Sequence, residues 1–322
     1  MQYLETKPLL IIAGPTASGK SALTVKVCLA LRAKGITTEI LCADSITVYK
    51  DFNIGAAKPS EEEQKLVPHH LLNLRTGEEN FTAGDFVQTA EPIIQSLHAK
   101  NILPVLVGGT GFYIRALVQG MTDEPEHLAE RSAEIKEQLE ERVAKEGIET
   151  LYQEMLTLDP ILKEKIHNND HYRVVRALQA MLTTGTRWST LNETAKQSPP
   201  KYGNSKYFCL DIPRETLRTR VEARTKNMLA SGLLQEVQQL LKQGISPQAK
   251  PLLSVGYKEC VQQLLSPGEM KESLELSIVR ETMRLAKRQR TFFRGEKNIA
   301  WLSGINEEEN LAEIIAGLPN LG

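Results

Sequence analysis

The sequence lacks the features expected of a secreted, membrane-spanning or metal-clustered protein. Its four cysteines, Cys28, Cys42, Cys209 and Cys260, include no C-x-x-C pair, so neither a zinc knuckle nor a disulfide framework is predicted. The N-terminal apolar run is too short for a signal peptide, and no run reaches the roughly 18 apolar residues of a membrane span. Scattered free thiols are typical of a reducing compartment. We therefore expect a cytoplasmic protein with no membrane partner, and we expect a monomer.

Net charge is also almost absent, at −1 over 322 residues. A nucleic-acid partner would need a local basic surface, because the molecule as a whole attracts it little. The apolar share of 41% and the charged share of 25% are ordinary for a globular protein. The chain exceeds the size at which one core grows easily, so a second lobe or an insertion is expected.

Short apolar runs alternate with helical patterns in the first third of the chain. Strands are predicted at 8–13, 38–43 and 102–107, and helices at 20–34 and 82–100, the latter with Thr82 as its N-cap. This alternation predicts a parallel sheet with helices on its faces.

Strand signals disappear between 123 and 199. Helices are predicted there at 126–146 and 172–184, the second ending at Gly185, and the segment closes at Ser198-Pro199-Pro200. Beyond it, strands are predicted at 206–212 and 298–302, and helices at 214–230, 233–243 and 270–292. The sequence therefore predicts an α/β core from residues 1–122 and 200–322, interrupted by an all-helical insertion at 123–199.

A complete phosphate-binding motif, G-x-x-x-x-G-K-[ST], follows the first predicted strand and opens the first predicted helix. The backbone N–H groups of such a loop and the N-terminus of its helix favour an anion. Lys20 adds a positive charge, and Ser21 offers a hydroxyl to Mg²⁺. The core is therefore predicted to be P-loop NTPase-like. Its diphosphate or polyphosphate is expected at Gly14, Pro15, Thr16, Ala17, Ser18, Gly19, Lys20 and Ser21.

The metal-binding carboxylate usual in NTPases is missing, because the strand at 102–107 runs into Gly-Gly-Thr-Gly. The carboxylate at a strand end is Asp44. Ligands of open α/β sheets bind outside the carboxyl ends of the strands, so Asp44 and the P-loop should face one crevice. There, Asp44 can accept a proton from an acceptor substrate. Alternatively it caps the following turn.

Seven segments carry a more specific signal than any single motif. They are GPTASGKSAL (14–23), ADSITVYKDFNIGAAKP (43–59), VPHHLL (67–72), LVGGTGFYIRALVQG (106–120), LRTRVEARTKNMLASGLLQEVQQLL (217–241), SVGYKE (254–259) and RLAKRQRTFFR (284–294). In these segments, and in their order, the chain resembles the tRNA dimethylallyltransferase (tRNA isopentenyltransferase) family. It departs from the family pattern at Thr47, Ala56 and Phe292, where the family usually has Gln, Thr and Trp.

The resemblance implies a reaction and roles for single residues. A dimethylallyl group would pass from dimethylallyl diphosphate to the exocyclic amine of the adenosine 3′-adjacent to the anticodon, with Mg²⁺ as the cofactor. Lys20, Thr16 and Arg220 would act on the diphosphate, and Asp44 would accept the proton; for Arg220 and Arg224 the alternative is a solvated helix face. The insertion would clasp the tRNA anticodon stem-loop. The tRNA-binding residues implied are Asp44, Ser45, Ile46, Thr47, Thr110, Tyr172, Arg173, Arg176, Lys287, Arg288 and Arg294.

Arg280, Arg284, Lys287 and Arg288 are spaced to share one helical face. Beside the resemblance, we expect this face to contact phosphates; the alternative is an ordinary solvated face.

The resemblance implies a reaction channel between the core and the insertion. Three aromatic residues and two histidines of the matching segments are less informative. Tyr49, Phe112 and Tyr113 either wall the channel or belong to the core. His69 and His70 are weak indicators of a metal, and the sequence gives them no other role.

Three other functions stay open. A small-molecule kinase would place ATP on the P-loop and its acceptor on Asp44. An isopentenyltransferase acting on free AMP, ADP or ATP would use the same site. A non-catalytic RNA-binding module would carry a vestigial P-loop, although it would have no need of Lys20, Ser21 and Asp44 together.

Overall fold

A computed structural model describes residues 8–120, 128–197, 201–202, 204–266, 268 and 272–318 of the chain. The chain divides into two units: Met1–Val118 with Tyr202–Gly322, and Gln119–Lys201. The second unit overlaps the predicted insertion. The expected start of that insertion at Asp123 and its Ser-Pro-Pro exit lie outside the described residues.

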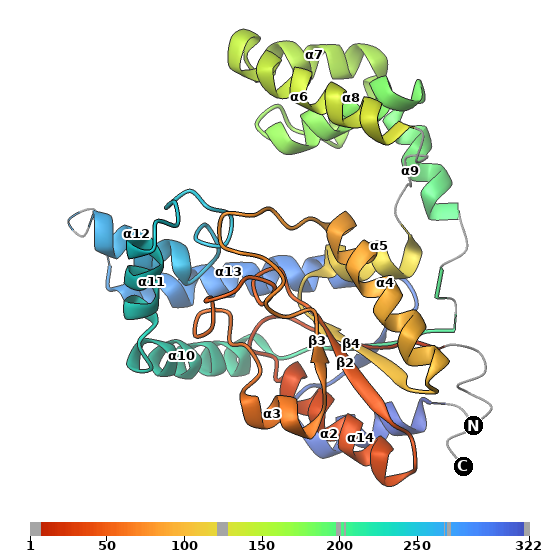
Figure 1. The fold of residues 1–322 in the computed structure, drawn as a ribbon, viewed down its shortest axis with the longest axis vertical. Coiled ribbons are helices and arrows are strands. Elements are labelled where there is room, and N and C mark those ends of the chain that lie inside the picture. The colour runs from red at the N-terminus through yellow and green to blue at the C-terminus, as the bar shows by residue number, and fades with distance from the viewer. Residues whose placement is uncertain are drawn as a thin grey trace. The chain divides into compact units, whose positions relative to one another are not determined.

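Six parallel strands form one sheet in the first unit (Figure 1). In spatial order they are β3 (His69–His70), β2 (Thr38–Ala43), β4 (Leu103–Gly108), β1 (Leu10–Ala13), β5 (Lys206–Leu210) and β6 (Ala300–Leu302). The central strand β1 pairs with β4 on one side and β5 on the other. Parallel strands bring their carboxyl ends to one edge, so the loops that follow β1, β2 and β4 meet there. The predicted α/β class with a P-loop-like parallel sheet is confirmed.

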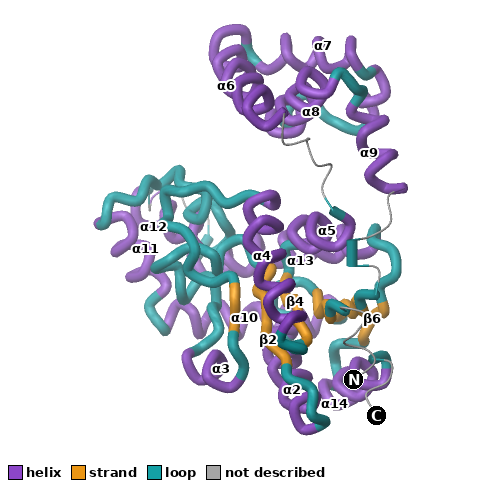
Figure 2. Tube along the Cα trace, turned by 45° about the vertical axis from the view of Figure 1, so that its right-hand side comes forward, coloured by secondary structure: helices purple, strands orange, loops and turns teal. Residues whose placement is uncertain are grey.

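Helices cover both faces of this sheet (Figure 2), and the strands are therefore apolar on both sides. In β1 and just before it, Leu9, Ile11 and Ala13 enter one core, whereas Leu10 and Ile12 enter the other. The helices of the first unit are α2 (Lys20–Ala33), α3 (Glu61–Leu66), α4 (Ala83–Ala99), α5 (Gly111–Gln119), α10 (Arg214–Ala230), α11 (Leu233–Lys242), α12 (Tyr257–Leu265), α13 (Leu274–Arg294) and α14 (Glu307–Ala316). Helices α10 and α13 pack against each other, and both carry residues of the site.

The described second unit is helical throughout. It contains α6 (Ala129–Glu146), α7 (Ile148–Leu158), a 3₁₀ turn (Pro160–Glu164), α8 (His171–Thr184) and α9 (Trp188–Gln197). Leu139, Leu151, Met155 and Leu178 are among the buried side chains of its separate core. Helix α8 begins at an Asp170 side chain that accepts from the Arg173 N–H at 3.2 Å, and it ends at the predicted Gly185, whose φ is 69°.

Several elements differ from the sequence expectations. Thr82 is the N-cap of α4 as predicted, in a capping box with Asp85. The predicted helix at 270–292 is α13, which starts at Leu274 and extends to Arg294. Strand β3 and helices α3, α5, α7, α9, α12 and α14 were not predicted. No described helix is long and apolar enough to cross a membrane.

Candidate active site

The P-loop connects β1 to α2 and is closed by a tight turn. The Ser18 N–H donates to the Pro15 carbonyl at 3.2 Å, and Ala17 and Gly19 adopt positive φ angles of 61° and 90°. This geometry starts α2 at Lys20, whose ammonium donates to the Pro15 carbonyl at 3.3 Å. The loop therefore presents its lysine beside a helix N-terminus, where an anion is favoured.

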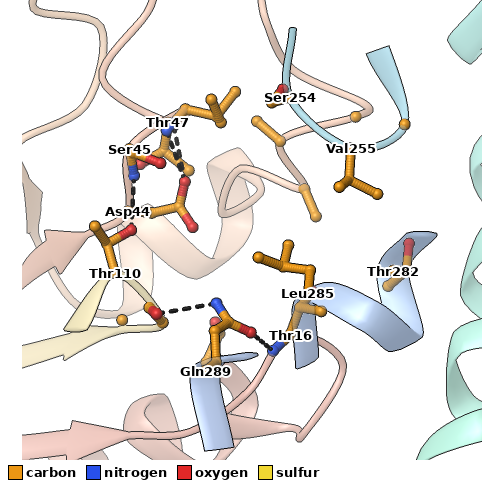
Figure 3. Close-up of a pocket in the computed structure, with 18 of the residues that line it drawn as sticks. Thr16, Asp44, Ser45, Thr47, Thr110, Ser254, Val255, Thr282, Leu285 and Gln289 are labelled. Carbon is orange, nitrogen blue, oxygen red and sulfur yellow. Dashed lines mark hydrogen bonds between the residues drawn. The ribbon is translucent and has the colours of Figure 1, made fainter. Parts of the chain in front are cut away.

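A cavity of about 570 Å³ opens at the carboxyl edge of the sheet. Thr16, Lys20 and Ser21 line it from the P-loop, and Asp44 lines it from the end of β2. The crevice expected between the P-loop and Asp44 is thus present in the structure. Figure 3 shows Thr16, Asp44 and Thr110 around this cavity, with Thr282, Leu285 and Gln289 of α13 also lining it.

Asp44 caps the following turn and also faces the cavity. Its Oδ1 accepts from the backbone N–H of Ile46 at 2.8 Å and of Thr47 at 3.3 Å. No hydrogen bond to Oδ2 is present among the described residues. The turn-capping alternative and the catalytic one are therefore compatible, because one carboxylate oxygen fixes the turn while the other is available to a substrate.

Two partly buried cations accompany this carboxylate. Burial lowers the pKa of Lys20 to about 8, while Asp44 partly opposes the shift and Arg224 adds to it. Burial also lowers the pKa of Arg224, and Asp44 again opposes the shift. Arg224 lines the main cavity. Two desolvated cations around one carboxylate form a site that is ready to accept the negative charge of a diphosphate.

Arg220 lies elsewhere. Its Nη1 donates to the Ser18 carbonyl at 2.9 Å and its Nη2 to the Gly304 carbonyl at 3.4 Å. It lines a second, smaller cavity of about 240 Å³ and not the main one. One turn further along α10, Arg224 lines the main cavity, whereas Arg220 touches the P-loop from the second cavity, and its expected role on the diphosphate stays a prediction. The motif R-T-R-V-E-A-R contains both, and the sequence carries no signal that separates them.

The loop after β4 is held against the loop after β2. The Thr110 N–H donates to the Ala43 carbonyl at 3.2 Å, and the Ser45 N–H donates to Thr110 Oγ1 at 3.1 Å. Gly108 makes this approach possible, because a Cβ there would lie 2.0 Å from the Ala43 carbonyl oxygen. Thr110 is thus a lining residue whose hydroxyl also satisfies local backbone. Ile46 and Thr47 line the same cavity, and the buried Thr47 Oγ1 has no partner among the described residues.

The aromatic candidates divide into core and cavity. Tyr49 and Tyr113 are buried in the core, with Tyr113 stacked on Phe86 at 4.6 Å between ring centroids. Phe112 is 57% exposed, lines the cavity and packs on Phe292 at 4.9 Å.

The basic face of α13 is less free than expected. Arg280 is paired with Glu272 and Glu281, and Arg284 is paired with Glu281 at 2.7 Å. Both arginines are exposed, so their expected contact with phosphates stays a prediction. Lys287 and Arg288 are exposed and form no ion pair among the described residues, and Arg288 also lines the cavity. Further along the helix, Arg294 lies 3.7 Å from Asp211.

The candidate tRNA-binding residues of the second unit all lie on α8. Tyr172 is 77% exposed at the start of the helix. Arg173 is paired with Asp170 at 3.3 Å, and Arg176 donates to the Gln179 side chain at 3.0 Å.

The two histidines have structural partners. In β3, His70 Nε2 lies 2.6 Å from Glu39 Oε2, and His69 Nδ1 lies 2.8 Å from the Val67 carbonyl. His69 also lines the cavity, and burial lowers its pKa. No cluster of His, Cys, Asp and Glu suited to a metal is found among the described residues.

The chain is similar to known proteins of one family. The model of the IPP transferase family matches residues 47–296. A tRNA dimethylallyltransferase 1 of Trichlorobacter lovleyi is 42% identical over 295 residues, covering 92% of this chain and 93% of that protein. A tRNA dimethylallyltransferase of Geobacter metallireducens is 37% identical, over 98% of this chain and 99% of its own.

A solved structure supports the same conclusion. The crystal structure of the full-length tRNA isopentenylpyrophosphate transferase of Bacillus halodurans has a TM-score of 0.67 and 31% identity to this chain, covering 97% of this chain and 96% of that one. The family model spans most of this chain, and the relatives are matched over nearly their whole length. The chain therefore belongs to the IPP transferase family, among relatives named tRNA dimethylallyltransferases.

Proposed function

We propose that this enzyme transfers a dimethylallyl group from dimethylallyl diphosphate to the exocyclic amine of the adenosine 3′-adjacent to the anticodon in tRNA. The products are N6-isopentenyladenosine and diphosphate. The observation that carries the proposal is a single cavity lined by Asp44 and by Thr16, Lys20 and Ser21 of a complete P-loop motif, in a chain of this family. We expect the enzyme to act in the cytoplasm, where its tRNA is found.

The leaving group needs stabilised negative charge. As the allylic C–O bond breaks, an electron pair stays on the diphosphate and positive charge develops on the allyl fragment. We assign that diphosphate to the P-loop N–H groups and to Lys20 and Arg224, which line the cavity. Because these groups are fixed before the reaction, they stabilise the developing charge without reorganisation.

A magnesium ion fits this donor set. Ser21, the last residue of the P-loop motif, lines the cavity, and the hydroxyl at this position of a P-loop holds Mg²⁺ together with substrate phosphates and water. A site without a dense carboxylate cluster among the described residues agrees with that pattern. Ser21 would hold the ion, which would supply neutralisation of charge on the leaving group.

The acceptor amine must lose a proton as its bond to carbon forms. We assign this proton to Asp44, whose Oδ1 accepts from the turn and whose Oδ2 has no hydrogen bond among the described residues. The hydrogen bonds of Ser45 and Thr110 keep that turn in place. A target base must leave its stack to reach such a cavity, and an anticodon loop makes that step less costly than a duplex would.

The tRNA backbone would be held by exposed cations at the cavity and by the helical unit. Lys287 and Arg288 are the available charges of α13, and we assign Tyr172, Arg173 and Arg176 of α8 to the stem-loop. Residues 123–199 would form a clasp for that stem-loop. If the addition of tRNA left hydrogen exchange across these residues unchanged, the clasp would be contradicted.

The acceptor distinguishes this proposal from its rivals. The enzyme is incubated with dimethylallyl diphosphate and Mg²⁺, and with either unmodified tRNA or AMP. Prenylation of tRNA with little product on AMP supports the proposal. Efficient prenylation of AMP, or consumption of ATP in place of dimethylallyl diphosphate, would refute it.

A further inference from the structure

The side chain of Gln289 on α13 joins two loops of the active site. Its Oε1 accepts from the Thr16 backbone N–H at 2.8 Å, and its Nε2 donates to the Gly109 carbonyl at 2.9 Å. Figure 3 shows both hydrogen bonds on the wall of the cavity. No other described side chain is hydrogen-bonded to both the P-loop and the loop after β4.

The two partners determine which end of the amide faces which loop. A backbone N–H can only donate and a carbonyl can only accept, so the oxygen must face Thr16 and the nitrogen must face Gly109. A carboxylate could take the first bond but not the second, and an apolar side chain could take neither. The position therefore requires a neutral amide of this length.

The fit at Gly109 is close. A Cβ on that residue would lie 2.6 Å from Gln289 Nε2. Any side chain there would displace the amide from its carbonyl partner. The glycine and the glutamine thus form one contact from two distant parts of the chain.

One of these loops serves the leaving diphosphate, and the other supports Asp44 and therefore the acceptor amine. Thr16 belongs to the loop that holds the leaving diphosphate. Gly109 precedes Thr110, whose N–H and hydroxyl bind the backbone on either side of Asp44. A shift of either loop would change the distance between the leaving group and the acceptor amine. Misplacement by about 1 Å can cost on the order of 10²-fold in rate.

The bond to Thr16 has a second consequence. P-loop N–H groups bind phosphate, and Gln289 engages one of them. Removal of the amide would release this N–H to a diphosphate. Diphosphate binding should therefore survive the loss of Gln289, whereas the alignment of the two substrates should not.

We propose that Gln289 is a positioning residue that sets the P-loop against the Asp44 side of the cavity, so that the allylic carbon faces the acceptor amine. This inference rests on the proposed prenyl transfer. It predicts that turnover and diphosphate affinity respond separately to changes at Gln289.

The test compares Gln289→Met, Gln289→Glu and the control Gln262→Met, which alters an exposed glutamine of α12. For each full-length enzyme, kcat for tRNA prenylation, the Kd of inorganic diphosphate and Tm are measured. Gln289→Met should lower kcat about 10- to 100-fold, with Kd within about threefold of wild type or tighter. Gln289→Glu should lower kcat and weaken diphosphate binding, because it adds a negative charge beside the anion. Gln262→Met should match wild type.

If the wild-type enzyme prenylates tRNA, either of two results would overturn the inference. One is an unchanged kcat in Gln289→Met. The other is a loss of diphosphate affinity in Gln289→Met that parallels the loss of kcat, since that would make the residue a support of the P-loop alone. A wild-type enzyme that binds diphosphate but prenylates no tRNA would instead count against the proposed function.

Discussion

Replacement of Asp44 by asparagine isolates the charge of this residue from its role in the turn. The two bonds accepted by Oδ1, from Ile46 and Thr47, can be kept by the asparagine carbonyl. What is lost is the negative charge and an oxygen able to take a proton. Positioned general bases contribute about 10²- to 10⁴-fold, so turnover should fall by at least about 10²-fold, or ~2.7 kcal/mol of barrier.

The same substitution has a second, independent signature at Lys20. Asp44 raises the pKa of Lys20 against the larger effect of burial, which brings it to about 8. Without the carboxylate, this pKa should fall further. Two measurements at pH 7 to 7.5 separate these effects. Single-turnover prenylation reports the loss of the proton acceptor, and calorimetry with inorganic diphosphate reports the change at Lys20.

Asp44→Asn should transfer the prenyl group slowly while still binding diphosphate. Gln262→Met serves as a control, because this exposed glutamine of α12 does not line the cavity. Near-normal turnover in Asp44→Asn would refute the general-base assignment and leave Asp44 as a turn cap.

Three further predictions follow from the charges of the site. Binding of diphosphate should favour charged Lys20, so affinity should fall by up to about tenfold per pH unit above pH 8. Lys20→Arg should remove this pH dependence. A pH profile shared by both enzymes would contradict the lowered pKa of Lys20. Arg224→Met should weaken diphosphate binding about 10- to 100-fold. Arg220→Met should mainly lower the free energy of unfolding, by ~1–2 kcal/mol in urea. The reverse pattern would assign the diphosphate role to Arg220. Replacing Lys287 and Arg288 by Ala should reduce the slope of log K for tRNA against log[salt] by about 1.4, and an unchanged slope would remove both from the phosphate contacts.

Local signals were sufficient to predict the P-loop and every strand of the sheet except β3. Apolar runs ending in glycine or Asp-Ser identified the first three long strands, and Thr82 was recognisable as a cap because its partner lies three residues away. Strand β3 has only two residues, too few to produce an alternating pattern, so the adjacent histidines gave no strand signal.

Contacts between distant segments could not be predicted. The bridge from Gln289 to Thr16 spans 273 residues, and nothing near Gln289 in the sequence indicates it. The choice between Arg220 and Arg224 depends on where α10 passes the P-loop. The ion pairs of Arg280 and Arg284 involve carboxylates that the spacing of basic residues along one helical face does not reveal.

The most direct test of the account is analysis of nucleosides from tRNA treated with the enzyme. Unmodified tRNA is incubated with dimethylallyl diphosphate and Mg²⁺, digested, and examined by mass spectrometry, with a parallel tRNA that carries another base 3′ to the anticodon. The account predicts one N6-isopentenyladenosine per tRNA, an equal amount of diphosphate released, and no product on the altered tRNA. Diphosphate release without a modified adenosine, or modification that ignores this position, would contradict it.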